Sequence, residues 1–311
     1  MPLAVGPAIS QMRGSMELVV TLVSPDPSSA ATAADAAKSA LAAAGAAVKA
    51  PRPLGEAAFE LPLLGDPADA RRIVERETAH MPVDWCVQPA AGRRKRLLVA
   101  DMDSTIINVE CLDELADYAG LKPHIAAITE RAMRGELEFE TALRERVALL
   151  RGLSVTALQQ AYDERVRLNP GARTLVRTMA ANGARCALVS GGFTFFTRRV
   201  AEAAGFHLDR ANTLVEAGGE LTGEVGEPIL GREAKLKALL EEAEGIGASL
   251  HETLAIGDGA NDLAMIEVAG LGVAYRAKPI VAAQADAKVD HADLTALLYF
   301  QGYRADEFVS D

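Results

Sequence analysis

Four short apolar runs, all in the last two thirds of the chain, limit the fold more than any other feature. Each run is continuous rather than alternating and is bounded by polar residues or glycine; they occupy 97–100, 186–189, 253–256 and 271–274. Runs of this kind are typical of strands buried on both faces of a sheet. Helical patterns lie between them, over 171–182, 194–204 and 233–244. The sequence therefore predicts a doubly wound α/β fold with a parallel core sheet, whose ligand site lies at the carboxyl ends of the strands.

The first ninety residues have a different pattern, in which short strands and helices alternate. Strands are predicted over 17–23, 57–63 and 83–87, an alanine-rich helix over about 32–44, and a helix over about 67–80 that Asp66 caps. This order predicts a small ferredoxin-like α+β domain over 16–90. We expect residues 1–15 to be disordered. Residues 88–92 and the basic run 93–96 are predicted to be a solvated linker to the second domain, which covers 91–311.

The charge of the chain excludes some classes of partner. Its formal net charge is -11 and its pI is near 5.1, which argues against nucleic acid or an anionic membrane as the main partner. No stretch of 18 uninterrupted apolar residues and no secretory signal is present. The cysteines, Cys86, Cys111 and Cys186, are widely spaced and form no CxxC motif, so we read them as reduced packing residues of a cytoplasmic protein.

Between the first and second core strands the sequence is helical throughout. No strand is predicted between 107 and 169, so a helical insertion, at about 108–170, is expected to lie over the carboxyl edge of the sheet as a cap. Farther along, the runs 213–217 and 221–225 flank a Gly-Gly-Glu turn and predict a hairpin. We interpret this hairpin as an elaboration without evident chemistry.

The first core strand ends in Asp101-Met102-Asp103-Ser104-Thr105, which places two carboxylates two residues apart. A close carboxylate pair is costly without a cation, and oxygen ligands favour Mg²⁺. One carboxylate is then suited to attack phosphorus, and the other to donate a proton to the leaving oxygen and to activate water. The alternative is a loop whose aspartates cap the following helix.

The second apolar strand ends in Ser190-Gly191-Gly192, where a hydroxyl group and backbone amides suit a phosphate oxygen. Lys235, near the start of a later helix, is a candidate to bring positive charge to the same oxygens. Taken separately, the glycines also fit an ordinary tight turn, and the lysine fits a solvated surface position.

The third apolar strand ends in an acidic, glycine-rich turn, residues 257–262. Asp258 is a candidate metal ligand, Asn261 is a candidate to orient the phosphate or the nucleophile, and Asp262 is a candidate either to hold Lys235 or to cap the helix. Three such turns at three strand ends of one sheet are hard to explain as separate caps. Their coincidence indicates a site.

These residues, in this order, resemble the four motifs of the haloacid dehalogenase-like phosphatases, over residues 97 to about 298. The resemblance implies that Asp101 is the nucleophile and Asp103 the general acid and base. It implies that Ser190 and Lys235 bind the phosphoryl group. It also implies that Asp258 completes a magnesium site with Asp101 and the backbone carbonyl of Asp103.

Within that superfamily the chain resembles the phosphoserine phosphatases, because the first motif is followed by Glu110 and by a cap segment that includes 133–139 and 143–147. The resemblance implies hydrolysis of O-phospho-L-serine, the last step of L-serine biosynthesis. Glu110 would meet the ammonium group, Arg146 the carboxylate, and Met133 and Phe139 would close the pocket. The Arg-x-Arg-Val spacing favours Arg146 over Arg144.

The N-terminal domain resembles, by the order of its elements, the amino-acid-binding ACT domains. It has no distinctive glycine-rich ligand loop, so a homodimer contact or a purely structural role is expected as readily as effector binding. Two other functions stay open. One is action on another small phosphomonoester, with sugar phosphates disfavoured by Glu110 and Arg146. The other is an amino-acid sensor with an inactive phosphatase body, disfavoured because Asp101, Asp103 and Asp258 are all present.

Overall fold

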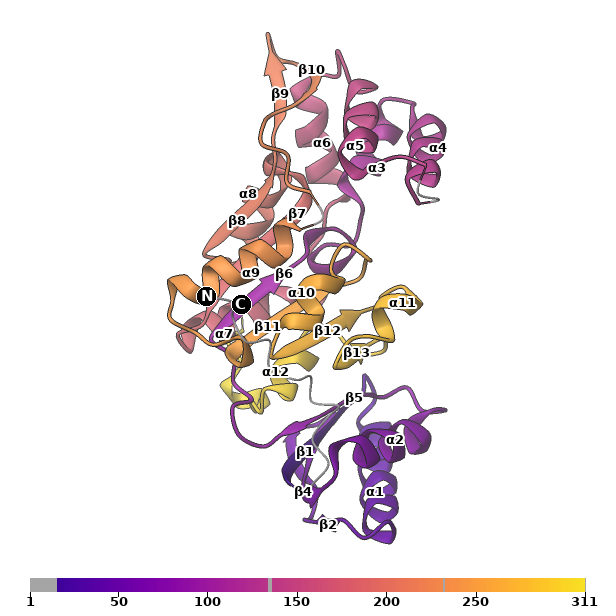
Figure 1. The fold of residues 1–311 in the computed structure, drawn as a ribbon, viewed down its shortest axis with the longest axis vertical. Coiled ribbons are helices and arrows are strands. Elements are labelled where there is room, and N and C mark those ends of the chain that lie inside the picture. The colour runs from indigo at the N-terminus through magenta and orange to yellow at the C-terminus, as the bar shows by residue number, and fades with distance from the viewer. Residues whose placement is uncertain (1–15, 134–135, 232, 311) are drawn as a thin grey trace.

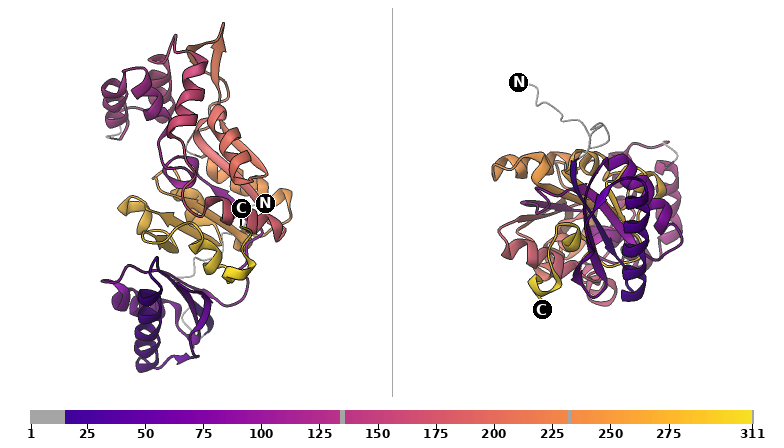
Figure 2. Two further views of the ribbon diagram at one scale, coloured as in Figure 1. Left: turned by 180° about the vertical axis from the view of Figure 1, so that it is seen from behind. Right: turned by 90° about the horizontal axis from the view of Figure 1, so that it is seen from below.

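The computed structural model describes residues 16–133, 136–231 and 233–310 (Figure 1). The molecule is elongated. An N-terminal α+β unit lies at one end, a group of helices and a hairpin lies at the other, and the main sheet lies between them. Seen from behind, the two outer parts keep their places at opposite ends (Figure 2). The prediction of disorder for residues 1–15 falls outside the described residues.

The main sheet has six parallel strands in the order β13-β12-β11-β6-β7-β8. The four predicted apolar runs are confirmed as its inner strands, β6 (Leu97–Ala100), β7 (Arg185–Phe193), β11 (Thr253–Gly257) and β12 (Leu271–Tyr275). Two edge strands were not predicted, β8 (Leu208–Asn212) and β13 (Ala287–Val289). Both are short, and β8 is mostly polar, so neither has the apolar run that marks a buried strand.

Helices cover both faces of this sheet, as a doubly wound fold requires. Leu98 and Leu188 face a core that includes Val176 and Phe196, from α7 (Ala172–Ala181) and α8 (Thr194–Ala204). On the other face, Leu97 and Val99 pack with residues of three helices, α9 (Ala234–Gly245), α10 (Leu263–Val268) and α11 (Pro279–Ala282). Alternate residues of one strand therefore pack into the two hydrophobic cores on opposite faces of the sheet.

The predicted helical insertion is confirmed. Its described residues form four helices, α3 (Cys111–Tyr118), α4 (Lys122–Met133), α5 (Phe139–Ala148) and α6 (Val155–Arg165). The predicted hairpin is confirmed as β9 (Leu214–Ala217) and β10 (Glu220–Val225). The hairpin is bonded to the insertion, because the amide of Gly152 donates to Leu221 O at 2.9 Å and the amide of Val155 donates to Gly219 O at 2.9 Å. We call the four helices the cap.

The N-terminal unit has an antiparallel sheet in the order β2-β4-β1-β5, with β3 also paired to β4. Its elements are β1 (Met16–Val23), α1 (Pro27–Ala43), β2 (Ala47–Val48), β3 (Arg52–Gly55), β4 (Ala58–Gly65), α2 (Pro67–Thr78) and β5 (Asp84–Pro89). The predicted start of α1, near Thr32, was wrong. The helix begins at Pro27 because the Asp26 carboxylate accepts the Ser29 amide at 2.9 Å and proline suits the first helical position.

The predicted solvated linker was wrong in part: Ala91, Gly92, Arg94 and Arg96 are exposed, but Gln88 and Lys95 are buried. Gln88 and Pro89 belong to β5, and the Gln88 amide donates to Phe300 O at 2.6 Å. Lys95 is buried, and its ammonium group donates to Gly92 O at 3.1 Å and to His251 O at 2.8 Å. A long lysine side chain that reaches backbone carbonyls satisfies its charge without solvent, and no local pattern in a basic run shows this.

The N-terminal unit is docked against the main body. Asp84, at the start of β5, accepts the backbone amides of Asp290 and Ala292 at 2.9 and 2.7 Å. Val23 and Cys86 share one buried cluster with Phe300, which ends α12 (Ala296–Phe300). In the described part of the chain no helix is long and apolar enough to cross a membrane.

Candidate active site

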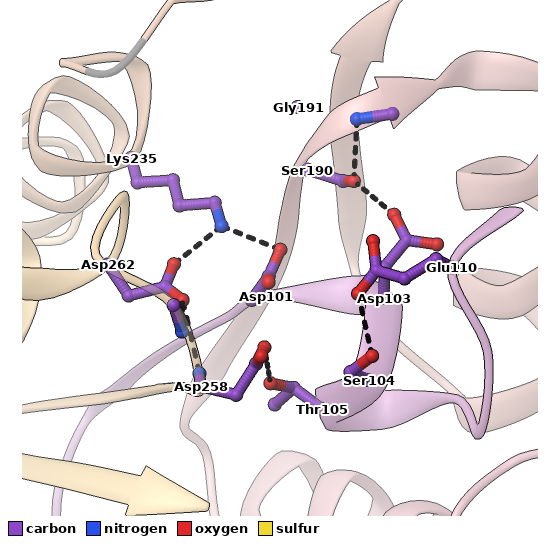
Figure 3. Close-up of polar contacts among 12 residues, drawn as sticks. Asp101, Asp103, Ser104, Thr105, Glu110, Ser190, Gly191, Lys235, Asp258 and Asp262 are labelled. Atoms are coloured by element: carbon purple, nitrogen blue, oxygen red, sulfur yellow. Dashed lines mark hydrogen bonds and ion pairs between the residues drawn. The ribbon is translucent and has the colours of Figure 1, made fainter. Parts of the chain in front are cut away.

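The loop after β6 carries the first candidate carboxylate at the carboxyl edge of the main sheet (Figure 3). The amide of Asp101 donates to Ile256 O of β11 at 3.0 Å, so the backbone of Asp101 is fixed between two central strands. The side chain is buried, and burial raises the pKa of this carboxyl, although the charge of Lys235 opposes the rise. A tight turn over Met102–Ile106 follows, in which the backbone of Asp103 is extended and Ser104 has a φ of 56°.

Lys235 lies between two buried carboxylates. Its Nζ is 2.6 Å from Asp101 Oδ1 and 2.5 Å from Asp262 Oδ1. Burial alone would lower the pKa of Lys235, but the charges of Asp101 and Asp262 outweigh that effect and raise it. The lysine is therefore a fixed cation beside Asp101 and not the solvated surface residue of the alternative interpretation.

Asp262 holds this lysine and also shapes the turn before α10. Its second oxygen, Oδ2, accepts the amides of Asp258 at 3.1 Å and of Gly259 at 3.0 Å. The side chain makes no capping hydrogen bond to α10, so of the two predicted roles the structure favours the contact with Lys235.

Asp103 lies between the cap and β7. Its Oδ1 accepts the amide of Cys111, the first residue of α3, at 2.9 Å, and its Oδ2 accepts the hydroxyl of Ser190 at 3.2 Å. Burial, together with the charge of Glu110, raises the pKa of Asp103 to about 6. A carboxyl group with a pKa near neutrality suits proton transfer in both directions.

Asp258 completes an acidic group suited to a metal ion. Oxygen atoms of Asp101, Asp258 and Asp262 lie within 4.8 Å of one another. Burial and then the charge of Asp262 raise the pKa of Asp258 to about 6, so a bound divalent cation would favour the ionised form of this carboxylate. Because Asp262 already binds Lys235 and two amides, Asp101 and Asp258 are the side chains that fit a hard divalent cation.

A small pocket opens beside these groups. It is lined by Phe139, Val189, Ser190, Gly191, Leu230, Gly231, Ala234, Lys235 and Asn261. It therefore contains the predicted phosphate-binding residues, and Asn261 reaches it from the third strand end. The hydroxyl of Ser190 accepts the amide of Gly192 at 2.8 Å. A Cβ atom at Gly192 would lie 3.0 Å from Asp103 Oδ2, so this position suits glycine.

The cap contributes the other predicted substrate residues. Glu110 is exposed at the start of α3 and accepts the Ser104 hydroxyl at 2.6 Å (Figure 3). Arg146, on α5, is half-buried; burial lowers its pKa, and the charges of Asp113 and Glu110 oppose that effect. Arg144 instead pairs with Glu227 next to the hairpin. The two arginines therefore have different partners: Arg144 pairs with Glu227, whereas the charges of Asp113 and Glu110 act on Arg146.

Of the two residues predicted to close the pocket, the structure describes the side chain of Phe139 but not that of Met133. Phe139 begins α5 and lines the pocket, and its ring lies 3.5 Å from the position that a Cβ atom would take at Gly191. Met133 ends α4, and its side chain lies outside the described part of the chain.

Sequence reasoning missed several contacts that organise the site. Thr105 donates its hydroxyl to Asp258 Oδ1 at 3.1 Å, and Cys111 and Gly192 bind Asp103 and Ser190 as described above. Thr105 belongs to the first motif, so its position in the sequence could have identified it as a residue of the site. Asn212, which donates to Gly191 O at 2.9 Å, stands in no motif.

A family model for the haloacid dehalogenase-like hydrolases matches residues 98–267. The chain belongs to this family. The hydrolase is 49% identical over 208 residues to a phosphoserine phosphatase from a Polaromonas species, a match that covers 65% of this chain and 88% of that protein. It is 42% identical over 234 residues to the phosphoserine phosphatase of Archaeoglobus fulgidus, covering 75% of this chain and 68% of that protein.

Solved structures agree with these relatives. This hydrolase is similar to a haloacid dehalogenase family hydrolase from Salmonella enterica serovar Typhi, with a TM-score of 0.80 and 27% identity over 92% of this chain and 98% of that chain. It is also similar to a substrate-bound phosphoserine phosphatase, with a TM-score of 0.62 and 37% identity over 67% of this chain and 98% of that chain.

Proposed function

We propose that this hydrolase converts O-phospho-L-serine to L-serine and inorganic phosphate through an aspartyl-phosphate intermediate on Asp101, as the final step of L-serine biosynthesis. One observation carries the choice of substrate. Arg146 is half-buried on α5, where the charges of Asp113 and Glu110 act on it, and Glu110, which binds the Ser104 hydroxyl, lies close enough to Asp103 to raise its pKa. Glu110 suits an ammonium group and Arg146 suits a carboxylate, so the two charges match the amino-acid part of phosphoserine.

In the first step, an oxygen of Asp101 attacks phosphorus and the bond from phosphorus to the seryl oxygen breaks. Asp103 donates a proton to the seryl oxygen as it leaves, for which its raised pKa is suited. Lys235, the hydroxyl of Ser190 and the amide of Gly191 bind the phosphoryl oxygens and so compensate their charge.

In the second step, Asp103 takes a proton from water, and the resulting hydroxide attacks phosphorus. The bond from phosphorus to Asp101 breaks, which releases inorganic phosphate and restores the carboxylate. Serine must leave before this step, because water needs the position that the seryl oxygen occupied.

The bound cation is proposed to be Mg²⁺, held by the carboxylates of Asp101 and Asp258 and by the backbone carbonyl of Asp103. Oxygen ligands of this kind suit a hard ion, which would offset the negative charge of the phosphoryl group and of the surrounding aspartates.

The N-terminal unit, by its element order, is proposed to be an ACT-like domain. We also predict, from the sequence, that this unit forms a homodimer. A cytoplasmic location of the protein is likewise a prediction.

The test of the substrate is phosphate release from phosphoserine, phosphothreonine, phosphohomoserine and a hexose phosphate, each with and without Mg²⁺. We expect the highest kcat/KM with phosphoserine and no turnover after chelation. A higher kcat/KM with the hexose phosphate, or with phosphohomoserine, would assign the site to another phosphomonoester. No turnover of any of them would favour a sensor with an inactive body.

A further inference from the structure

Asn212 has a side chain whose polar atoms all point at the backbone around the phosphate pocket. It is the last residue of β8 and is 1% exposed. Its Nδ2 donates to Gly191 O at 2.9 Å and to Leu230 O at 3.4 Å, and its Oδ1 accepts the amide of Leu230 at 2.7 Å. One buried amide group therefore connects two segments that are far apart in the sequence.

Both segments line the phosphate pocket, which includes Gly191 and Leu230. The carbonyl of Gly191 belongs to the same planar peptide as the amide of Gly192. That amide donates to the hydroxyl of Ser190 at 2.8 Å, and the same hydroxyl donates to Asp103. Fixing the Gly191 carbonyl therefore fixes the orientation of the peptide that holds Ser190.

Asn212 also stands at the base of the hairpin. The chain leaves the main body after Asn212, forms β9 and β10, and returns at Leu230, and the amide of Gly226 closes this base by donating to Thr213 O at 2.7 Å. The far end of the hairpin is bonded to the cap, as described above, and Glu227 pairs with Arg144 of α5. The same asparagine thus connects the phosphate pocket with the segment that holds the cap.

We propose that Asn212 is a positioning residue for phosphoryl transfer, which orients the Gly191–Gly192 peptide that holds the phosphate-binding hydroxyl of Ser190 and connects this peptide to the hairpin under the cap. It does not touch the substrate and acts through Gly191 and Leu230. The proposal rests on the proposed phosphatase activity, but it concerns phosphate binding and not the choice of the amino acid.

The test compares Asn212→Asp and Asn212→Ala with the parent protein. The aspartate variant keeps an acceptor for Leu230 and loses the donor to Gly191, whereas the alanine variant loses both. The matched control is Asn182→Asp, since Asn182 donates its side-chain amide to Thr178 O at 2.8 Å at the end of α7 and is not among the residues that line the pocket. Inhibition by inorganic phosphate, and KM and kcat with phosphoserine and p-nitrophenyl phosphate, are measured for each.

We expect both Asn212 variants to raise the inhibition constant of phosphate and the KM of both substrates about tenfold or more, the size expected for loss of a buried hydrogen bond. The control should change neither. A merely structural residue would lower the amount of active enzyme and thus the apparent kcat, and would leave KM and the inhibition constant unchanged. Inhibition constants and KM values within about twofold of those of the parent, in both variants, would overturn the proposal.

A measurement on the parent protein covers the case in which neither variant folds. Saturating inorganic phosphate should slow amide hydrogen exchange in β10 as well as at Leu230, because the pocket and the hairpin share Asn212. Unchanged exchange in β10 would contradict the connection. If phosphoserine is not hydrolysed but phosphate binding still depends on Asn212, the proposed substrate is wrong and the role of Asn212 stands.

Discussion

The Nζ of Lys235 lies 2.6 Å from Oδ1 of Asp101, and both side chains are almost fully buried, at 5% and 8% exposure. On its other side the lysine contacts Asp262, which is 0% exposed. One cation between two buried carboxylates leaves a net negative charge that a metal ion and the ordered amides of the site must offset. Removing any member of this group leaves a charge that is buried without its partner.

The first prediction concerns this lysine. Lys235→Ala should lower the free energy of unfolding by about 3–5 kcal/mol, because Asp101 and Asp262 lose their shared cation. It should also abolish detectable phosphate binding. Lys237→Ala is the matched control, since Lys237 lies on the same helix and pairs only with the half-exposed Glu241. Denaturant unfolding checks both variants, and equal stability of the two would refute this account of the group.

The second prediction separates the neighbouring arginines of α5. Arg146→Ala should raise the KM for phosphoserine about 30-fold or more, the effect of losing a charge-assisted contact with a carboxylate. Arg144→Ala, which breaks only the ion pair with Glu227, should leave KM within about twofold, as expected for an exposed pair. With p-nitrophenyl phosphate, which has no amino-acid part, both variants should match the parent. A reversed order would show that Arg144 is the carboxylate ligand.

The third prediction concerns pH and Mg²⁺. Burial and neighbouring negative charges raise the pKa values of Asp103 and Asp258 from 3.8 to about 6 in the folded protein. The folded state therefore holds these protons more tightly than the unfolded state, and without metal the stability should fall as pH rises from about 4 to about 6.

Mg²⁺ needs the ionised carboxylates, so the rise in Tm that it causes should grow over the same pH interval. Scanning calorimetry at a series of pH values, with Mg²⁺ and with chelator, measures this difference. Asp258→Asn should remove most of the rise in Tm. A rise that is larger at low pH than near neutrality would contradict the proposed ligands.

The sequence was most informative where a candidate site residue stands next to a recognisable strand pattern. Asp101 and Asp258 directly follow apolar strands, and Ser190 follows the apolar run within β7; parallel strands bring their carboxyl ends to one edge, so local patterns sufficed to predict that these side chains lie together. Lys235 was inferred only with the others, because a lysine on a helix carries no mark of burial.

Contacts between distant segments were not predictable in this way. Asn212 stands in a polar edge strand, and its importance lies in three backbone groups of other segments, Gly191 O and the carbonyl and amide of Leu230. Lys95 was taken as solvated, because two of the three carbonyls that its ammonium group reaches, those of His251 and Gly270, lie far along the chain. The docking of β5 depends on Asp84, whose hydrogen-bond donors, the amides of Asp290, His291 and Ala292, are likewise distant in sequence.

The fourth prediction concerns that docking. Asp84→Asn should lower the free energy of unfolding by about 1–3 kcal/mol, because an amide cannot accept all the backbone amides that the carboxylate binds. The kcat should not change, because the Asp84 carboxylate binds backbone amides just after the edge strand β13, and none of these residues is a candidate site residue. Asp69→Asn, at an exposed ion pair of the same unit, should be neutral. A loss of kcat in Asp84→Asn without a loss of stability would mean that the unit acts on the site directly.

The central claim is that Asp101 carries the phosphoryl group during turnover. The most direct measurement mixes the Mg²⁺-loaded protein with ³²P-labelled phosphoserine, quenches with acid, and locates covalent label by peptide mapping. We predict alkali-labile label on the peptide that contains Asp101, and neither label nor phosphate release in Asp101→Asn. Turnover by Asp101→Asn at the parent rate, or label on a different residue of the parent protein, would contradict the mechanism.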